Sequence, residues 1–211
     1  MMTPARRTAE STARLRASLI DCAQRLVARD GARALTMRAL AAEAGCALGL
    51  PYKVFASREE LIAELIRIEY ARLRDAFAKV IASAGTGTVG GNLGRYAEAL
   101  LASPAVSLAP ELHSDEALRK AVDEEAVEAG LVGAVESTVV QYLAAEKRLG
   151  RVAPDVDERA FGFLIAGAVH NLLHAGTAYP NPGIGAVKRM LGAIAVRLAP
   201  PQRKEKSHGR K

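Results

Sequence analysis

Apolar side chains recur at spacings of three and four along most of the chain, which is the pattern of amphipathic helices. Over residues 11–30 this stripe stops at Gly31, a residue type that commonly closes a helix. Thr36 is a suitable N-cap for a short helix over 37–44, and Ser57 opens a capping box with Glu60 for a long helix to about Ser83. No segment alternates with period two, so the sequence predicts an all-α fold.

Beyond Ser83 the pattern changes. The glycine-rich stretch 84–94 predicts a loop and a candidate domain boundary. Further helices are predicted over 92–103, 115–130, 131–149, 155–175 and 183–198. The end of the chain, residues 200–211, is rich in Lys and Arg and is predicted to be a disordered basic tail.

Two short helices are predicted to meet at Gly45. Glycine permits the positive φ that swings the second helix across the first, and Ala41 is small enough for a close approach. Cys46 and Phe55 are apolar and can anchor the second helix to a core. This spacing predicts a helix–turn–helix over about 36–55.

Composition adds to this picture. The chain has 211 residues, half of them hydrophobic, with a formal net charge of +6. Two cysteines cannot build a disulfide framework, and the start lacks the apolar region of a signal peptide. We therefore expect a soluble, cytoplasmic protein with no membrane partner. Lys and Arg outnumber Asp and Glu over residues 1–58, which indicates an anionic partner for the helix–turn–helix segment.

An ordered set of residues follows the helix that ends at Gly31. It reads Thr36-x-Arg38-x-Leu40-Ala41-x-x-Ala44-Gly45-Cys46, then Gly49, Tyr52, Phe55 and Ser57-Arg58-Glu59-Glu60-Leu61. With this set, residues 12–65 resemble the TetR family of transcriptional regulators. The resemblance implies an N-terminal three-helix, helix–turn–helix DNA-binding domain over 10–60. A helical ligand-binding and dimerisation domain over 61–199 would follow it.

The resemblance also implies roles for residues near the turn. The family's counterparts of Thr36 and Tyr52, and often the neighbour of the latter, bind backbone phosphate. Where the family often has polar or cationic residues, this chain has Leu48, Leu50 and Pro51, which leaves thymine methyls and DNA shape as features to read. A remodelled, non-binding module is the alternative. The predicted DNA-binding residues are Thr36, Met37, Arg38, Ala47, Leu48, Leu50, Tyr52, Lys53 and Arg58.

The predicted helix over 155–175 is apolar on nearly all sides, so it must be buried on two faces. In TetR-like proteins the last two helices form a four-helix dimer interface. The predicted interface residues here are Phe161, Leu164, Ile165, Ala168, Leu172, Val187, Met190, Leu191 and Ile194.

The same resemblance implies that the C-terminal body binds a small, mostly apolar effector. His170 and His174 stand one turn apart and could line its cavity or the interface, but no accompanying motif favours a metal site. The other candidate pocket residues are Tyr96, His113 and Tyr142. The sequence predicts no cofactor.

The leading hypothesis is a regulator rather than an enzyme. It would be a repressor that binds double-stranded DNA as a homodimer on a palindromic operator and is released by its ligand. The alternatives are an effector-less DNA-binding protein and a helical enzyme using His170 and His174.

Overall fold

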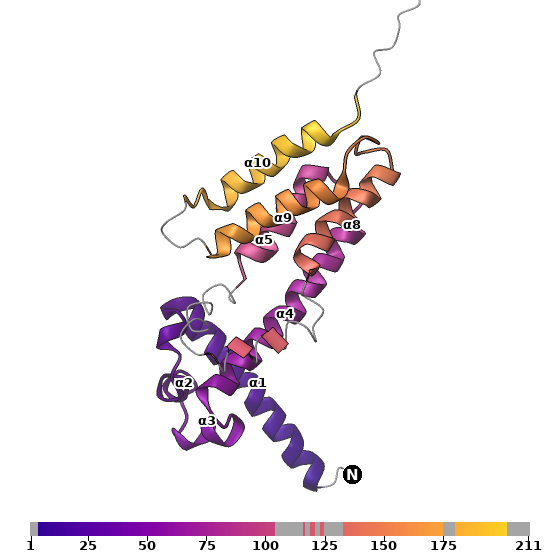
Figure 1. Cartoon of the computed structure of the whole chain (residues 1–211). Coiled ribbons are helices and arrows are strands. Elements are labelled where there is room, and N and C mark those ends of the chain that lie inside the picture. Colours follow the sequence, from indigo (N-terminus) through magenta and orange to yellow (C-terminus); the bar gives the residue numbers. More distant parts are fainter. Residues whose placement is uncertain are drawn as a thin grey trace, which may run out of the picture. The chain divides into compact units, whose positions relative to one another are not determined.

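The computed structural model describes residues 4–103, positions 116, 119, 120, 123 and 124, and residues 133–174 and 180–201, with only the backbone of 4–9 and 174. All regular elements in these ranges are helical, which confirms the predicted all-α fold (Figure 1). They are α1 (Pro4–Asp30), the 3-10 turn η1 (Ala32–Ala34), α2 (Met37–Glu43), α3 (Gly49–Val54), α4 (Arg58–Ala82), α5 (Val89–Leu101), α8 (Ala134–Arg148), α9 (Glu158–His174) and α10 (Gly183–Leu198).

The described helices form two compact units. The N-terminal unit takes in residues up to Arg74 and 102–132, and the C-terminal unit takes in 75–101 and the chain from Gly133. Helix α4 contributes to both units. Most of the predicted helix over 115–130, and the tail from 202, lie outside the described residues. Within the described part of the chain, no helix is long and apolar enough to cross a membrane.

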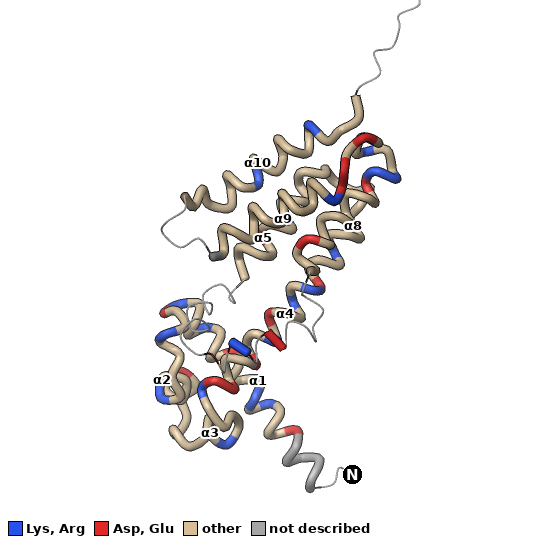
Figure 2. The backbone as a smooth tube through the Cα atoms, in the orientation of Figure 1, with Lys and Arg blue, Asp and Glu red and all other residues tan. Residues whose placement is uncertain are grey.

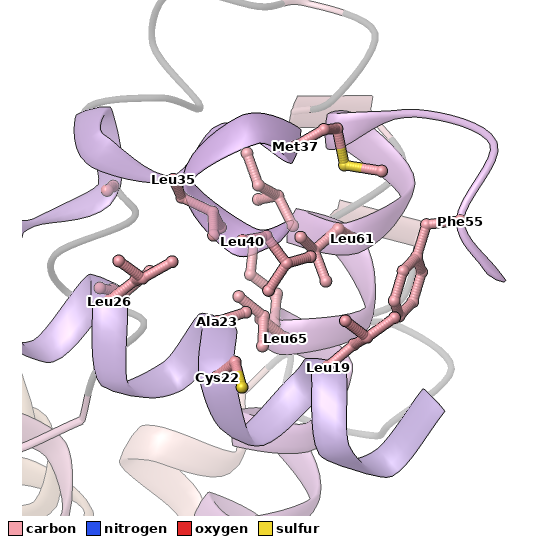
Figure 3. Close-up of a cluster of buried hydrophobic side chains, with 14 residues drawn as sticks. Leu19, Cys22, Ala23, Leu26, Leu35, Met37, Leu40, Phe55, Leu61 and Leu65 are labelled. Atoms are coloured by element: carbon pink, nitrogen blue, oxygen red, sulfur yellow. The ribbon is translucent and has the colours of Figure 1, made fainter. Parts of the chain in front are cut away.

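The core of the N-terminal unit is built from the stripe that the sequence predicts on α1. Leu19 is fully buried, as are Leu40 of α2 and Leu61 of α4, and their side chains converge in one cluster (Figure 3). Phe55, just after α3, is also fully buried in this cluster, whereas Cys46 packs against it only partly buried. The anchoring role predicted for Phe55 and Cys46 therefore fits the packing.

Local signals set the ends of these short helices. The Thr36 hydroxyl accepts a hydrogen bond from the Ala39 amide at 3.0 Å, as expected of an N-cap. Gly45 has φ +63, the left-handed conformation that the turn requires. At the start of α4, Ser57 Oγ accepts from the Glu60 amide at 3.2 Å, while the Glu60 carboxylate accepts from the amide of Ala56 at 2.7 Å. The capping box is thus present with its return bond one residue earlier than in the usual motif.

The C-terminal unit is a bundle in which α5 packs on α10 and α8 packs on α9 (Figure 1). The loop predicted over 84–94 is wrong in its second half, because α5 begins at Val89. Two of its glycines serve close packing instead. A Cβ on Gly90 would lie 2.8 Å from the Gly192 Cα, and one on Gly94 would lie 3.2 Å from Lys188 Cγ. Helix packing therefore compensates for the poor helix propensity of glycine.

Candidate nucleic-acid interface and apolar groove

The turn between α2 and α3 presents an exposed surface. Ala47 and Leu48 precede α3 and are exposed, Leu48 by 43 %, while Tyr52 of α3 is exposed by 53 %. Lys53 is exposed beside it, and Leu50 is half-buried. We call the group Arg38, Ala47, Leu48, Tyr52 and Lys53 the α3 face. All of its members are among the predicted DNA-binding residues.

Pro51 does not distort α3. The helix begins at Gly49, so Pro51 stands in the first turn, where backbone amides have no partner within the helix. Its side chain is buried, and its carbonyl accepts a hydrogen bond from the Phe55 amide at 2.9 Å. Proline is therefore compatible with the helix at this position and helps to fix α3 on the core.

The cations of the α3 face have no acidic partner among the described residues. Among the residues that the structure describes, Arg38 and Lys53 make no ion pair, and α3 itself contains no acidic residue. Figure 2 shows the positions of Lys and Arg in blue along the tube, including segments at α2 and α3. The charge of Arg38 and Lys53 is therefore available to an anionic partner.

Other arginines of the N-terminal unit are engaged in holding it together. Glu43, at the end of α2, pairs with Arg29 at 3.1 Å and with Arg25 at 3.2 Å, both from α1. These hydrogen bonds, first that of Arg29, lower the pKa of the Glu43 carboxyl below its ordinary value. The pairs fasten α2 to α1, a role that the sequence reasoning missed.

Arg58, a predicted DNA-binding residue, also has a structural role. Its guanidinium donates to the carbonyl oxygens of Leu35 at 2.6 Å and Ala32 at 3.2 Å. Ala32 begins η1 and Leu35 directly follows it, so Arg58 joins the start of α4 to that turn. The Met37 side chain is 5 % exposed and belongs to the core, and the predicted DNA contact at Met37 stays a prediction.

Arg16 on α1 is another arginine that the sequence analysis did not single out. Its guanidinium lies over the Phe55 ring at 4.7 Å from the centroid and pairs with Glu64 of α4 at 3.0 Å. It also donates to the Val54 carbonyl at 3.4 Å, at the end of α3. Arg16 thus ties α1 to α4 and to α3. No local motif indicates this, because the partners are distant in sequence.

In the C-terminal unit, α9 and α10 line a groove of about 480 Å³. We call it the α9/α10 groove. Every described residue of its lining is apolar, and Leu164 and Met190 are exposed by 61 % and 55 %. The structure brings together at this groove the whole set predicted for the dimer interface: Phe161, Leu164, Ile165, Ala168, Leu172, Val187, Met190, Leu191 and Ile194.

The predicted pocket residues do not come together in the same way. Tyr96 is fully buried and its hydroxyl donates to the Val135 carbonyl at 2.7 Å. Tyr142 is also fully buried and donates to the Glu146 carboxylate at 2.6 Å. Burial raises the pKa of both hydroxyls. Both tyrosines are core residues whose hydroxyls are already satisfied within the unit, and their assignment to a pocket stays a prediction.

Of the three histidines predicted to line a pocket, only His170 has a described side chain. His170 is exposed on α9, whereas His113 and the side chain of His174 lie outside the described residues. In the part of the chain that the structure describes, no group of three or more His, Cys, Asp or Glu side chains could hold a metal ion.

The buried carboxylate that accepts from Tyr142 has further partners. The Glu146 side chain is fully buried, accepts from the Gly85 amide at 3.2 Å and lies 3.4 Å from Arg151. Asn92, equally buried, donates to the carbonyls of Ser83 and Thr86 at 3.1 and 3.0 Å. This polar cluster fixes the turn between α4 and α5.

The N-terminal unit has the architecture of a helix–turn–helix DNA-binding domain: a short capped α2, a glycine turn, and a short α3 with a cationic exposed face. Residues 19–65 match the family described as bacterial regulatory proteins, tetR family. This match assigns the helix–turn–helix segment to the DNA-binding type of that family, as the sequence predicts.

Solved structures share the fold over nearly the whole chain. A protein from Mesorhizobium loti, described as a TetR-family transcriptional regulator, is 17% identical over 89% of this chain and 96% of its own, with a TM-score of 0.62. Escherichia coli NemR in its reduced form is 16% identical, with 88% and 97% covered and a TM-score of 0.63. A protein from Saccharomonospora viridis, described as a transcriptional regulator and solved in complex with choline, is 18% identical, with 90% and 100% covered and a TM-score of 0.64. No curated protein sequence matches the chain.

Proposed function

We propose that the chain acts as a homodimeric repressor on a palindromic operator and that a small effector releases it from DNA. The observation that carries the dimer is the α9/α10 groove, whose described lining is apolar throughout. An open apolar groove on an isolated chain marks an interaction surface. A second copy offers the same surface, so a two-fold axis can cover both grooves at once.

A dimer also increases the number of base pairs that the protein can contact. One α3 of six residues can contact few base pairs. Two copies related by a two-fold axis would read half-sites about 34–36 Å apart, or a multiple of that turn. Operator symmetry would then follow from protein symmetry.

Contacts to the DNA backbone are assigned to side chains that are exposed and, within the described residues, make no ion pair: Arg38 and Lys53. The Tyr52 hydroxyl, on the same face, would donate to a phosphate. Thr36 keeps its predicted place beside the backbone, since the hydroxyl that accepts from Ala39 can still donate its own proton. Arg58 and the Met37 side chain are left out, because both are used inside the unit.

Release by an effector is supported by the organisation of the chain and by a relative. Helix α4 contributes to both units, so a ligand that favours one arrangement of them would change operator affinity. The protein from Saccharomonospora viridis was solved with choline bound. No effector contact is assigned to Tyr96 or Tyr142. His113, His170 and His174 stay candidates.

The experiment combines sedimentation with mobility shift on the DNA upstream of the protein's own gene. We expect a dimer at micromolar concentration and retardation of one fragment that survives excess competitor DNA. Retardation without sequence preference would instead support the effector-less DNA-binding protein. A monomer, or no retardation even at low salt, would contradict the proposal.

The effector is tested separately. A panel of small apolar and cationic compounds is screened by thermal shift, and each compound that raises Tm is added to the protein–operator complex. We expect at least one compound both to stabilise the protein and to release the DNA. Stabilisation without release would contradict effector control and leave the dimer and the operator standing.

A further inference from the structure

The part of the α3 face that precedes Tyr52 lacks hydrogen-bonding side chains. Ala47, Leu48 and Gly49 are exposed there, Leu50 is half-buried and Pro51 is buried. The first polar side chain along α3 is that of Tyr52. Where a recognition helix usually presents donors and acceptors to base edges, this one presents methyl and isobutyl groups.

Leu48 is not a core residue that is merely incompletely covered. Its exposed fraction is 43 %, whereas Leu40 of α2 and Leu61 of α4 are fully buried in the adjacent cluster. A single exposed leucine is common on protein surfaces and by itself means little. Leu48, however, lies within a few residues of Lys53 on a segment without acidic side chains, so the surface around it suits a polyanion.

Gly49 lets this segment come close to a partner. A Cβ built at Gly49 would meet nothing within 4 Å, so the position beside Leu48 is open on the surface. With no side chain at Gly49, the backbone can approach the floor of a groove more closely than any other residue would allow. Leu48 and Ala47 would then reach the base edges directly.

The major groove offers one apolar feature to such side chains, the C5 methyl group of thymine. Guanine, cytosine and adenine present donors and acceptors that a leucine would desolvate without replacing their hydrogen bonds, which is costly. We propose that Leu48, supported by Ala47, selects thymine methyls, so that each operator half-site carries thymine where it faces the start of α3. This inference rests on the proposed function, because it requires α3 to enter the major groove.

The test uses the full-length protein and an operator obtained by selection from random duplexes. Each thymine of the half-site is replaced in turn by deoxyuridine, which removes the methyl group and keeps base pairing. We expect one or two positions at which the dissociation constant rises about fourfold per half-site, since burying one methyl group is worth about that factor. Replacement in both half-sites together should raise it about 15-fold.

The side chain is then identified with variants. The Leu48→Ala protein should bind the thymine and deoxyuridine operators about equally, whereas Leu48→Met should keep the discrimination. Leu149→Ala is the matched control: this leucine, in the C-terminal unit, is 57 % exposed, and its removal should leave the discrimination unchanged. Circular dichroism melting checks that each variant is folded.

The outcomes distinguish thymine selection by Leu48 from operator binding as such. A protein that binds its selected operator with no deoxyuridine effect, or a Leu48→Ala variant that retains the effect, overturns the thymine inference and leaves operator binding intact. Failure to select any DNA overturns the proposed function and this inference with it.

Discussion

The α3 face and the α9/α10 groove both leave apolar side chains exposed, but their surroundings differ. On the α3 face, exposed Leu48 and Ala47 share a short segment with Lys53, for which the structure shows no ion pair among the described residues. In the groove the described lining is wholly apolar. Apolar groups beside cations suit DNA, a polyanion whose bases carry thymine methyl groups. An uninterrupted apolar groove suits the same groove on a second copy of the chain. The neighbours of an exposed leucine thus carry more information than its exposure.

The largest expected effect comes from placing a charge in the groove. Met190→Asp should raise the dimer dissociation constant about 1000-fold, because two methionine contacts are lost per dimer, each worth about 1.5–3 kcal/mol, and two carboxylates are introduced. Operator affinity should fall with it. Sedimentation and mobility shift measure the two quantities.

Leu149→Asp is the control for this substitution. Leu149 is exposed by 57 %, close to the 55 % of Met190, and does not belong to the described lining of the groove. A dimer that persists in Met190→Asp, or that is lost equally in Leu149→Asp, would show that the groove is not the interface.

A smaller effect is expected on the α3 face. Lys53→Ala should weaken operator binding roughly 10- to 100-fold near 0.1 M salt, because a dimer loses two phosphate contacts. The slope of log affinity against log salt should become less steep by roughly 2. Mobility shift at several salt concentrations measures both.

Arg29→Ala serves as the matched variant, since Arg29 is paired with Glu43 at 3.1 Å. It should lower Tm and leave the salt slope unchanged. If Lys53→Ala keeps the full slope of log affinity against log salt while Arg29→Ala reduces it, the proposal is wrong about which cation contacts phosphate.

The smallest effect concerns the pH dependence of the N-terminal unit. Hydrogen bonds from Arg29 and Arg25 lower the pKa of Glu43 below its ordinary value of 4.5. The stability gained is therefore complete above that value and is lost as pH falls through the lower pKa of the folded state. Wild type should melt above Glu43→Gln at pH 7, and the difference should shrink below pH 4.5. A Tm difference that grows on acidification would contradict this sign.

Local chemistry made much of the fold predictable. Gly31, Thr36 and Gly45 act through their own backbone or cap geometry, so the ends of the early helices follow from sequence. The last helix was predicted over 183–198 and has these bounds. The loop prediction over 84–94 is wrong in its second half because Gly90 belongs to a helix that packs closely against Gly192. That residue is more than a hundred positions away in the chain, so no local pattern indicates the contact.

The site was predictable to a different degree in the two units. Apolar periodicity on two consecutive helices sufficed to predict the residues of the α9/α10 groove. Residue type alone does not show how Arg58 and Tyr142 are bonded, since a guanidinium can donate to carbonyls as well as to phosphates and a tyrosine hydroxyl can donate to a buried carboxylate. Only the tertiary partner distinguishes these uses.

The open surface position at Gly49 has a consequence for how the proposed DNA specificity can change. Nothing lies within 4 Å of the place where its Cβ would be, and its φ is not in the left-handed region, so larger residues fit without disturbing the fold. One or two nucleotide changes in the Gly49 codon would introduce asparagine or arginine, whose side chain could donate hydrogen bonds to base edges. Substitution at Gly49 is accordingly a route by which engineering or natural selection could change the operator specificity without loss of stability.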